Sequence, residues 1–281
     1  MNSQELVIPG LSIAYKTWGN PENPPIIALH GWLDNANSFD PLAEYLKNNY
    51  YFIAIDFPGH GHSAHLPQSS NYHFIDGIFI IVQIINALKL DKVHLIGHSM
   101  GACLASIVGG IAPNRFLSIG LIEGLGPFSH PDESACEQLT TYLDYLTHQE
   151  IKKTKGYHEF EHAALARSLK GYVSFEIAKI LCQRALVKKH GIYYWRHDKR
   201  LLAPSPLRMT EQQILSCLKQ ISAKTCLIWA SKGFSFDSKL MQERIKTVSN
   251  LKIMHLDGGH HIHMEQPELV GQLLTDFYLS L

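Results

Sequence analysis

The pentapeptide Gly97-His98-Ser99-Met100-Gly101 follows directly after the apolar run Val93-His94-Leu95-Ile96. Gly-X-Ser-X-Gly at the end of a strand is the sequence form of a nucleophile elbow, in which a serine occupies a sharp strand-to-helix turn. The turn requires both glycines, because a Cβ atom at either flanking position would collide with neighbouring chain. Small apolar residues from 102 to 108 then indicate a helix packed under a sheet. The stretch therefore predicts a nucleophilic serine at the end of a buried strand.

Strand and helix patterns alternate on both sides of this stretch. Short, uninterrupted apolar runs of this kind are typical of a sheet covered by helices on both faces. We expect strands at 11–18, 25–29, 51–55, 93–96, 118–122, 225–230 and 251–256. We expect helices at 39–46, 74–88, 100–111, 238–248 and 267–279. The order predicts an α/β fold with a largely parallel sheet.

The alternation stops between Gly124 and Gln220, where helical patterns follow one another with no clear strand. A sheet that is interrupted and later completed indicates an insertion. We therefore predict an α/β core made of residues 1–123 and 221–281. Residues 124–220 are expected to form a helical cap on the edge of the sheet that binds ligands.

The composition excludes several classes of partner. Lys+Arg and Asp+Glu both number 25 in the 281 residues, so no net charge favours nucleic acid or an anionic membrane. The five cysteines are scattered without a CxxC pair, which favours reduced thiols. No signal peptide is recognisable at the amino terminus, and the apolar stretch 75–88 is interrupted by Asp76, Gln83 and Asn86. We expect a cytoplasmic protein without membrane insertion or a nucleic-acid partner, and its oligomeric state stays open.

A general base for Ser99 is expected in the glycine-rich loop that follows the last strand. This loop reads from Leu256 to Pro267 and carries three histidines, among which His260 is favoured over His261 and His263. The spacing of the histidines at 255, 260, 261 and 263 matches no zinc pattern, and no ligand set of cysteines or carboxylates accompanies them. We expect no metal and no cofactor.

Acyl transfer also needs N–H donors for the oxyanion that forms at the reacting carbonyl. Leu29-His30-Gly31-Trp32 follows a predicted strand, so its backbone should lie at the same sheet edge as Ser99. The backbone N–H groups of Trp32 and Met100 are the expected donor pair, and a plain His-Gly turn is the alternative. The neighbouring Asp34 and Asn35 suit either a pocket mouth or a turn.

Taken together, these motifs resemble the α/β-hydrolase superfamily, in family order, from about residue 11 to the carboxyl terminus. The resemblance rests on His30-Gly31, residues 56–63 (Asp-Phe-Pro-Gly-His-Gly-His-Ser), residues 97–101 and residues 259–267. Residues 30–40, 122–127 and 194–201 are similar more particularly to the serine hydrolase-like (kraken-like) group. The resemblance implies an eight-stranded, mostly parallel sheet and a Ser-His-acid triad. In such a sheet, the cap predicted for residues 124–220 is inserted after the sixth strand.

The acid of that triad departs from the family pattern. Most relatives carry an aspartate after the penultimate strand, where this chain has Ala230-Ser231-Lys232-Gly233. Glu123, directly after the strand 118–122, is the first candidate, because some relatives place the acid there and a glutamate has the longer reach. A hinge residue at the start of the cap is the alternative interpretation of Glu123. Asp237 is the second candidate, and Asp257 is set aside because it should point along its own strand.

Two functions follow. The first is a serine hydrolase of the carboxylesterase or lipase kind that cleaves a small ester or thioester through an acyl-enzyme, with Ser99, His260 and Glu123 as its triad. The second is a ligand-binding or regulatory protein on the same fold, for which Gly233 at the usual acid position is the best support. The fold itself decides neither, because it hosts many chemistries.

Overall fold

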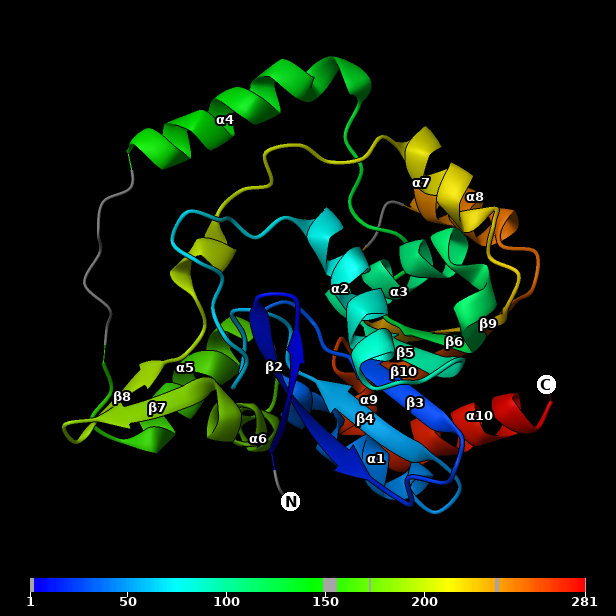
Figure 1. Ribbon diagram of the computed structural model, residues 1–281, viewed down its shortest axis with the longest axis horizontal. Coiled ribbons are helices and arrows are strands. Elements are labelled where there is room, and N and C mark those ends of the chain that lie inside the picture. The colour runs from blue at the N-terminus through cyan, green and yellow to red at the C-terminus, as the bar shows by residue number, and fades with distance from the viewer. Residues whose placement is uncertain (1–2, 149–155, 172, 236–237, 281) are drawn as a thin grey trace.

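The computed structural model describes residues 3–148, 156–171, 173–235 and 238–280. They form a central sheet with helices on both faces and a group of further elements beside it (Figure 1). Within these ranges, every helix is too short or too polar to cross a bilayer.

The central sheet contains eight strands. Their spatial order is β1 (Gln4–Ile8), β2 (Leu11–Trp18), β4 (Tyr51–Ile55), β3 (Pro25–Leu29), β5 (Val93–His98), β6 (Phe116–Ile122), β9 (Lys224–Lys232) and β10 (Leu251–Gly259). Strand β2 is antiparallel to both of its neighbours, and the other pairs are parallel. The expected eight-stranded, mostly parallel sheet is confirmed. Strand β1 escaped the sequence analysis because it is a largely exposed edge strand without a buried pattern.

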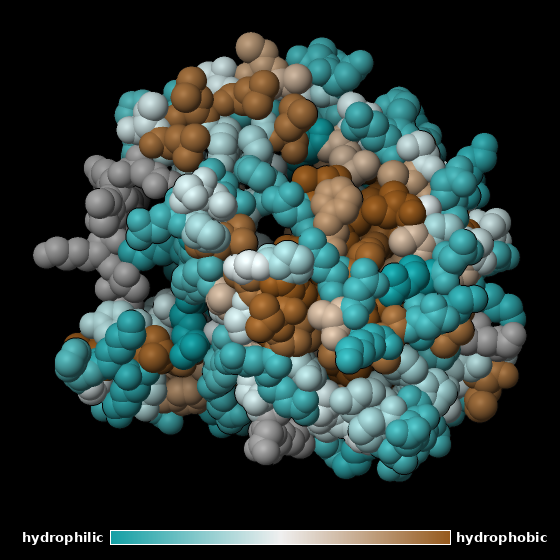
Figure 2. Space-filling model, viewed as in Figure 1, coloured by the Kyte–Doolittle hydropathy of each residue, from teal (hydrophilic) through white to brown (hydrophobic). Residues whose placement is uncertain are grey.

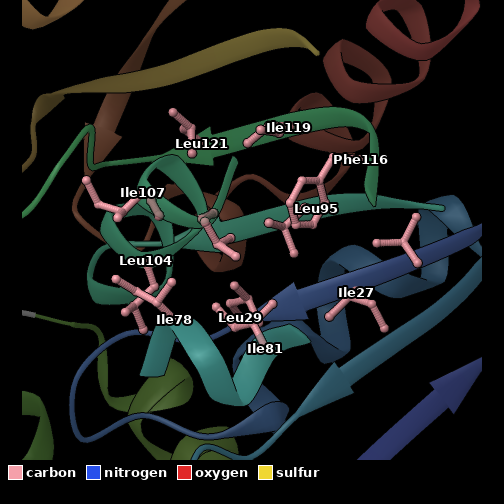
Figure 3. Close-up of a cluster of buried hydrophobic side chains, with 14 of the residues drawn as sticks. Ile27, Leu29, Ile78, Ile81, Leu95, Leu104, Ile107, Phe116, Ile119 and Leu121 are labelled. Carbon is pink, nitrogen blue, oxygen red and sulfur yellow. The ribbon is translucent and has the colours of Figure 1, made fainter. Parts of the chain in front are cut away.

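Two hydrophobic cores cover the two faces of the sheet. One face carries α2 (Phe74–Ala87), α3 (Met100–Ile111), α7 (Glu211–Leu218) and α8 (Ser238–Thr247). The other carries α1 (Asp40–Leu46), α9 (Ile262–Glu265) and α10 (Pro267–Leu279). Successive strand residues serve opposite cores: Ile27 lies with Ile78 and Ile81 of α2 (Figure 3), and its neighbour Ile26 lies in the second core. Each such fully buried side chain stabilises the fold by about 1.5–3 kcal/mol.

The chain between β6 and β9 forms a second group of elements. These are α4 (Ala135–Thr147), α5 (Phe160–Gly171), α6 (Phe175–Ala185), β7 (Leu186–Lys189) and β8 (Ile192–Trp195), and the chain then returns to the sheet with α7. In Figure 1, α4 crosses the top of the view and β7 and β8 lie at the lower left. The boundaries proposed for a cap stay a prediction.

The expectation that this segment contains no strand was wrong. Strands β7 and β8 pair as an antiparallel hairpin, with Lys189 opposite Ile192. The two residues between them, His190 and Gly191, have φ values of 49° and 80°, the backbone that a tight hairpin turn requires. The run Ile192-Tyr193-Tyr194-Trp195, with one β-branched and three aromatic residues, is a strand signal, but the helical patterns on either side concealed it.

Parallel strands bring several loops to one edge of the sheet. Leu29 at the end of β3 lies opposite Gly97 of β5, and His98 lies opposite Ile122 of β6. Ile122 in turn lies opposite Ile228 of β9. The loops that leave these carboxyl ends, together with the loop after β10, therefore meet beside Ser99.

Candidate active site

Ser99 occupies the strained turn that the pentapeptide predicts. It lies between β5 and α3 with φ of 52° and ψ of −114°, a conformation that costs energy for any residue with a side chain. A Cβ atom at Gly97 would lie 2.3 Å from the carbonyl oxygen of Gly101. A Cβ atom at Gly101 would lie 2.1 Å from the carbonyl oxygen of Leu29. Both positions therefore accept only glycine.

His260, directly after β10, faces the serine. Its Nε2 lies 2.9 Å from Ser99 Oγ. The other two histidines of the loop have different partners: His261 Nε2 lies 3.0 Å from Asp34 Oδ2, and His263 Nε2 lies 2.7 Å from a serine hydroxyl before α1. Of the three candidates, His260 is the one that contacts the nucleophile position.

Glu123, directly after β6, reaches the other side of the His260 ring. Its Oε2 lies 3.0 Å from His260 Nδ1, and its side chain is completely buried. The carboxylate also accepts the backbone N–H groups of Ala230 at 2.7 Å and Phe234 at 2.9 Å. The backbone N–H of Glu123 donates to the carbonyl oxygen of Ile228 at 3.0 Å, and its φ is 56°. Strand β9 and the loop that follows it thus fix both the backbone and the carboxylate.

The glycine at the usual acid position lies against this carboxylate. A Cβ atom on Gly233 would lie 1.9 Å from Glu123 Oε2, so the glutamate occupies the space that a side chain at 233 would need. The second candidate, Asp237, lies outside the described residues. The side chain of Asp257 is 79% exposed and accepts a hydrogen bond from Ser231 at 2.5 Å.

The hydrogen bonds assign the tautomer of His260. A carboxylate only accepts, so the ring proton lies on Nδ1 and is donated to Glu123 Oε2. Nε2 then presents its lone pair to the hydroxyl of Ser99, within the distance needed for proton transfer. This arrangement can take a proton from the serine and stabilise the imidazolium that results.

The two residues expected to supply oxyanion donors lie at the same edge. Met100 is the first residue of α3, where backbone N–H groups have no partner inside the helix. Trp32 lies in the loop after β3, the strand next to β5. Its indole N–H donates to the carbonyl oxygen of Leu201 at 3.1 Å, while its side chain stays largely accessible. The oxyanion role of the two N–H groups stays a prediction.

Two buried neutral histidines support the loop that carries Trp32. His30 accepts the backbone N–H of Phe57 on Nε2 at 3.0 Å. His60 accepts the backbone N–H of Leu33 on Nε2 at 3.2 Å. Burial lowers the pKa of both rings, that of His60 to about 3. Both rings are therefore uncharged at neutral pH, and each fixes a loop by accepting a backbone N–H group.

A buried carboxylate, Asp34, joins the same loop to distant parts of the chain. Its Oδ1 accepts Arg167 of α5 at 2.5 Å, and its Oδ2 lies 3.0 Å from His261 Nε2 and 3.7 Å from His98 Nδ1. Burial alone would raise the pKa of Asp34, but His261 and Arg167 hold it well below its usual range. From the sequence, Asp34 was expected only to line a pocket mouth or to form a turn.

The atoms of Asp34, His98 and His261 lie within 4.8 Å of one another, a spacing that a cation site also shows. The charge of this carboxylate is already matched by Arg167, and one of its oxygens accepts from His261. The group is thus held together as an ion-paired network within the protein. That no metal is bound stays a prediction.

Apolar side chains approach His260 from two segments, the loop after β9 with Phe234 and the chain after β6 with Phe128. The ring of Phe234 lies 6.0 Å from that of His260, and the ring of Phe128 lies 5.6 Å from that of Phe234. Phe128 also borders a cavity of about 150 Å³, lined by His73, Phe74, Ile75, Pro127 and residues 205–209. Further out, α4 exposes Leu139, Leu143 and Leu146. Brown, hydrophobic residues gather in the same region at the top of Figure 2.

The comparisons with known proteins establish the family. Residues 24–267 match the family model described as the alpha/beta hydrolase fold. The chain therefore belongs to the α/β-hydrolase family.

Relatives named as serine hydrolases, as the motifs led us to expect, are found in several eukaryotes. A serine hydrolase-like protein of Dictyostelium discoideum is 32% identical over 95% of this chain and 79% of its own length. A probable serine hydrolase of Drosophila melanogaster is 30% identical over 97% of this chain and 86% of its own length. The resemblance to the serine hydrolase-like group is thereby confirmed.

Solved structures agree with the fold. A hypothetical protein of Pseudomonas aeruginosa superposes with a TM-score of 0.94 at 33% identity and covers 99% of both chains. The thioesterase domain from the curacin biosynthetic pathway superposes with a TM-score of 0.85 at 28% identity, over 98% of this chain and 99% of that one. The chain is thus similar, over nearly its whole length, to hydrolases and to proteins of unassigned activity.

Proposed function

We propose that this α/β hydrolase is a serine hydrolase of the carboxylesterase or lipase kind, which cleaves a small ester or thioester through an acyl-enzyme. The observation that carries the proposal is the continuous contact from Ser99 Oγ to His260 Nε2 at 2.9 Å and from His260 Nδ1 to Glu123 Oε2 at 3.0 Å. A serine hydroxyl becomes an effective nucleophile only when an oriented base stands beside it.

In the proposed reaction, Ser99 Oγ attacks the acyl carbon while its proton passes to His260 Nε2. The leaving alcohol or thiol takes that proton, and the acyl group stays on Ser99 as an ester. Water then attacks the acyl carbon, gives a proton to His260, and releases the carboxylic acid as Ser99 regains its proton. Glu123 stabilises the imidazolium at both stages.

The backbone N–H groups of Trp32 and Met100 hold the oxyanion in this scheme. Both residues stand at the ends of adjacent strands next to Ser99, and Met100 N–H belongs to the first turn of α3. The helix N-terminus adds a favourable positive end to its dipole for the developing negative charge.

Residues 124–220 form the cap in this proposal, and the apolar side chains near His260 bind the acyl group. The thioesterase title of one structural neighbour and the name monoacylglycerol lipase of a relative from Rattus norvegicus, 23% identical over 95% of this chain and 79% of its own length, support an acyl substrate. All five cysteines are free thiols, which supports a cytoplasmic location.

The alternative, a ligand-binding protein without turnover, was favoured by Gly233. That support weakens, because the carboxylate of Glu123 fills the space at 233 and contacts His260. A binding protein also has no need of the strained backbone at Ser99.

A fluorophosphonate probe tests the proposal, because it reacts with activated serines. We expect the wild-type protein to be labelled and the Ser99→Ala variant to remain unlabelled. p-Nitrophenyl esters of increasing chain length, and thioesters of the same acids, should be hydrolysed in a Ser99-dependent way. Folded wild-type protein that resists the probe and binds these compounds without turnover would favour the alternative.

A further inference from the structure

The carboxylate of Asp34 lies between three parts of the chain. Arg167 of α5, 133 residues away in sequence, donates to Oδ1, and His261 donates to Oδ2. His261 is the residue next to His260. Asp34 itself belongs to the loop after β3 and closes its turn by donating its backbone N–H to Gly31 at 3.1 Å. One carboxylate thus touches α5, the loop of the proposed base and the loop of Trp32.

A further histidine near Asp34, His98, donates to the backbone of His260. His98 Nε2 lies 2.8 Å from the carbonyl oxygen of His260. Because a carbonyl oxygen only accepts, Nε2 carries the ring proton and Nδ1 is left unprotonated. Nδ1 points toward Asp34, 3.7 Å from Oδ2, and has no hydrogen-bond partner among the described residues. Asp34 is therefore bonded to His261, the residue next to His260, and lies near His98 without a hydrogen bond to it.

The ion pair is buried, with side chains 2% exposed for Asp34 and 17% for Arg167. A buried ion pair adds little net stability compared with apolar residues of similar size, because removing both charges from water is costly. Its clearest effect is to fix geometry. The end of α5 leaves room for it: a Cβ atom at Gly171 would lie 1.7 Å from Arg167 Nη1.

We propose that Asp34 is a positioning residue through which Arg167 of α5 holds the His260 loop in the orientation that faces Ser99. The inference rests on the proposed function, in which His260 is the base. It makes the placement of α5 a condition for catalysis, although α5 contributes no group to the proposed triad. A displacement of the base by about 1 Å is enough to lower kcat about 100-fold.

Four variants test the link: Arg167→Met, Arg167→Lys, Asp34→Asn, and the double variant Asp34→Asn/Arg167→Met. We expect kcat for Ser99-dependent ester hydrolysis to fall about 10- to 100-fold in Arg167→Met and Asp34→Asn, with KM changed less than about 2-fold. Arg167→Lys keeps the charge and should restore most of the rate. The double variant removes both charges, so it should fold even if a single variant does not, and it should stay as slow as the single variants.

Hydrogen exchange of the backbone amides in residues 257–263 gives a second readout that needs no turnover. Arg167→Met should increase exchange in this segment, although the substitution lies on α5. The matched control is Lys179→Met on α6, because the Lys179 ammonium pairs with Glu176 and lies over the ring of Phe175, both on the same helix. The control should change neither exchange nor kcat.

Two outcomes overturn the proposal. One is a wild-type kcat in the double variant, which would mean that Asp34 and Arg167 only neutralise each other's charge. The other is unchanged exchange of 257–263 in folded Arg167→Met. If the wild-type protein shows no Ser99-dependent hydrolysis, the proposed function fails on that result, and the exchange measurement still decides the link by itself.

Discussion

The free energy of unfolding should fall steeply as the pH drops from 7 to 5, because His60 and His94 are buried as neutral rings. Burial lowers the pKa of His60 to about 3 and that of His94 to about 4, compared with 6.5 for an exposed histidine. Between pH 4 and pH 6.5, both histidines are mostly protonated in the unfolded chain and mostly neutral in the folded chain. Stability is therefore fully present above pH 6.5 and is lost as the pH falls below it.

The structure explains why both rings stay neutral. His60 Nε2 accepts the backbone N–H of Leu33 at 3.2 Å. Protonation of Nε2 would therefore place its hydrogen against the hydrogen of that N–H group. His94 bonds to Ser118 Oγ through Nδ1 at 2.8 Å and is only 6% exposed. Among the residues that the structure describes, neither ring has a carboxylate in hydrogen-bond contact that would stabilise an imidazolium.

The magnitude follows from linkage. At pH 5 each group costs about 2 kcal/mol of stability relative to pH 7, so the two together cost about 4 kcal/mol. The free energy of unfolding of a typical domain is about 5–15 kcal/mol, so protonation of these two histidines removes a large part of it.

Urea unfolding at pH 7 and pH 5 measures the effect. The His94→Asn variant keeps a partner for Ser118 and removes one titrating ring, so its loss between the two pH values should be about 2 kcal/mol smaller than that of the wild type. His190→Asn is the matched control, because His190 is exposed and asparagine tolerates its φ of 49°. An equal loss in the wild type and in His94→Asn would refute the reasoning.

Three further substitutions test the site. Glu123→Gln should lower kcat about 10³- to 10⁴-fold in ester hydrolysis, because the amide no longer fixes the tautomer of His260 or stabilises its charge. A rate within 10-fold of the wild type would show that another residue is the triad acid. Gly233→Ala should lower both kcat and the melting temperature, because the methyl group would lie 1.9 Å from Glu123 Oε2, and unchanged values would contradict that packing. Gly101→Ala should leave little folded protein by circular dichroism, because its Cβ atom would lie 2.1 Å from the carbonyl oxygen of Leu29, which the sheet prevents from moving; a native melting curve would argue against the elbow geometry.

Local patterns were sufficient to predict most of the core. The elbow at residues 97–101 combines a strand, two obligatory glycines and a helix within a short stretch, so its geometry is determined by near neighbours. The loop from 256 to 267 could be placed beside Ser99 because parallel strands bring their carboxyl ends to one edge. Glu123 could be selected as a candidate for the same reason.

Contacts between distant segments could not be predicted in this way. Nothing in the sequence around Arg167 indicates that it reaches Asp34, because a polar residue on a helix usually faces solvent and its partner lies 133 residues away. The β7–β8 hairpin was missed because His190-Gly191 is not a common hairpin turn and strand pairing depends on the partner strand. Gly233 was interpreted as a loss, because a missing side chain does not reveal which other side chain fills its volume.

The side chain of Glu123 and a side chain at position 233 would occupy the same space, so only one of the two positions can supply the triad acid. Strands β6 and β9 offer two attachment points for one negative charge, and the space beside the imidazole admits a side chain from only one of them. A single substitution at 123 or at 233 would leave that space doubly filled or empty, so moving the acid from one strand to the other requires paired changes. Among aligned relatives, an acidic residue at 233 should accompany a non-acidic residue at 123, and glycine at 233 should accompany glutamate at 123.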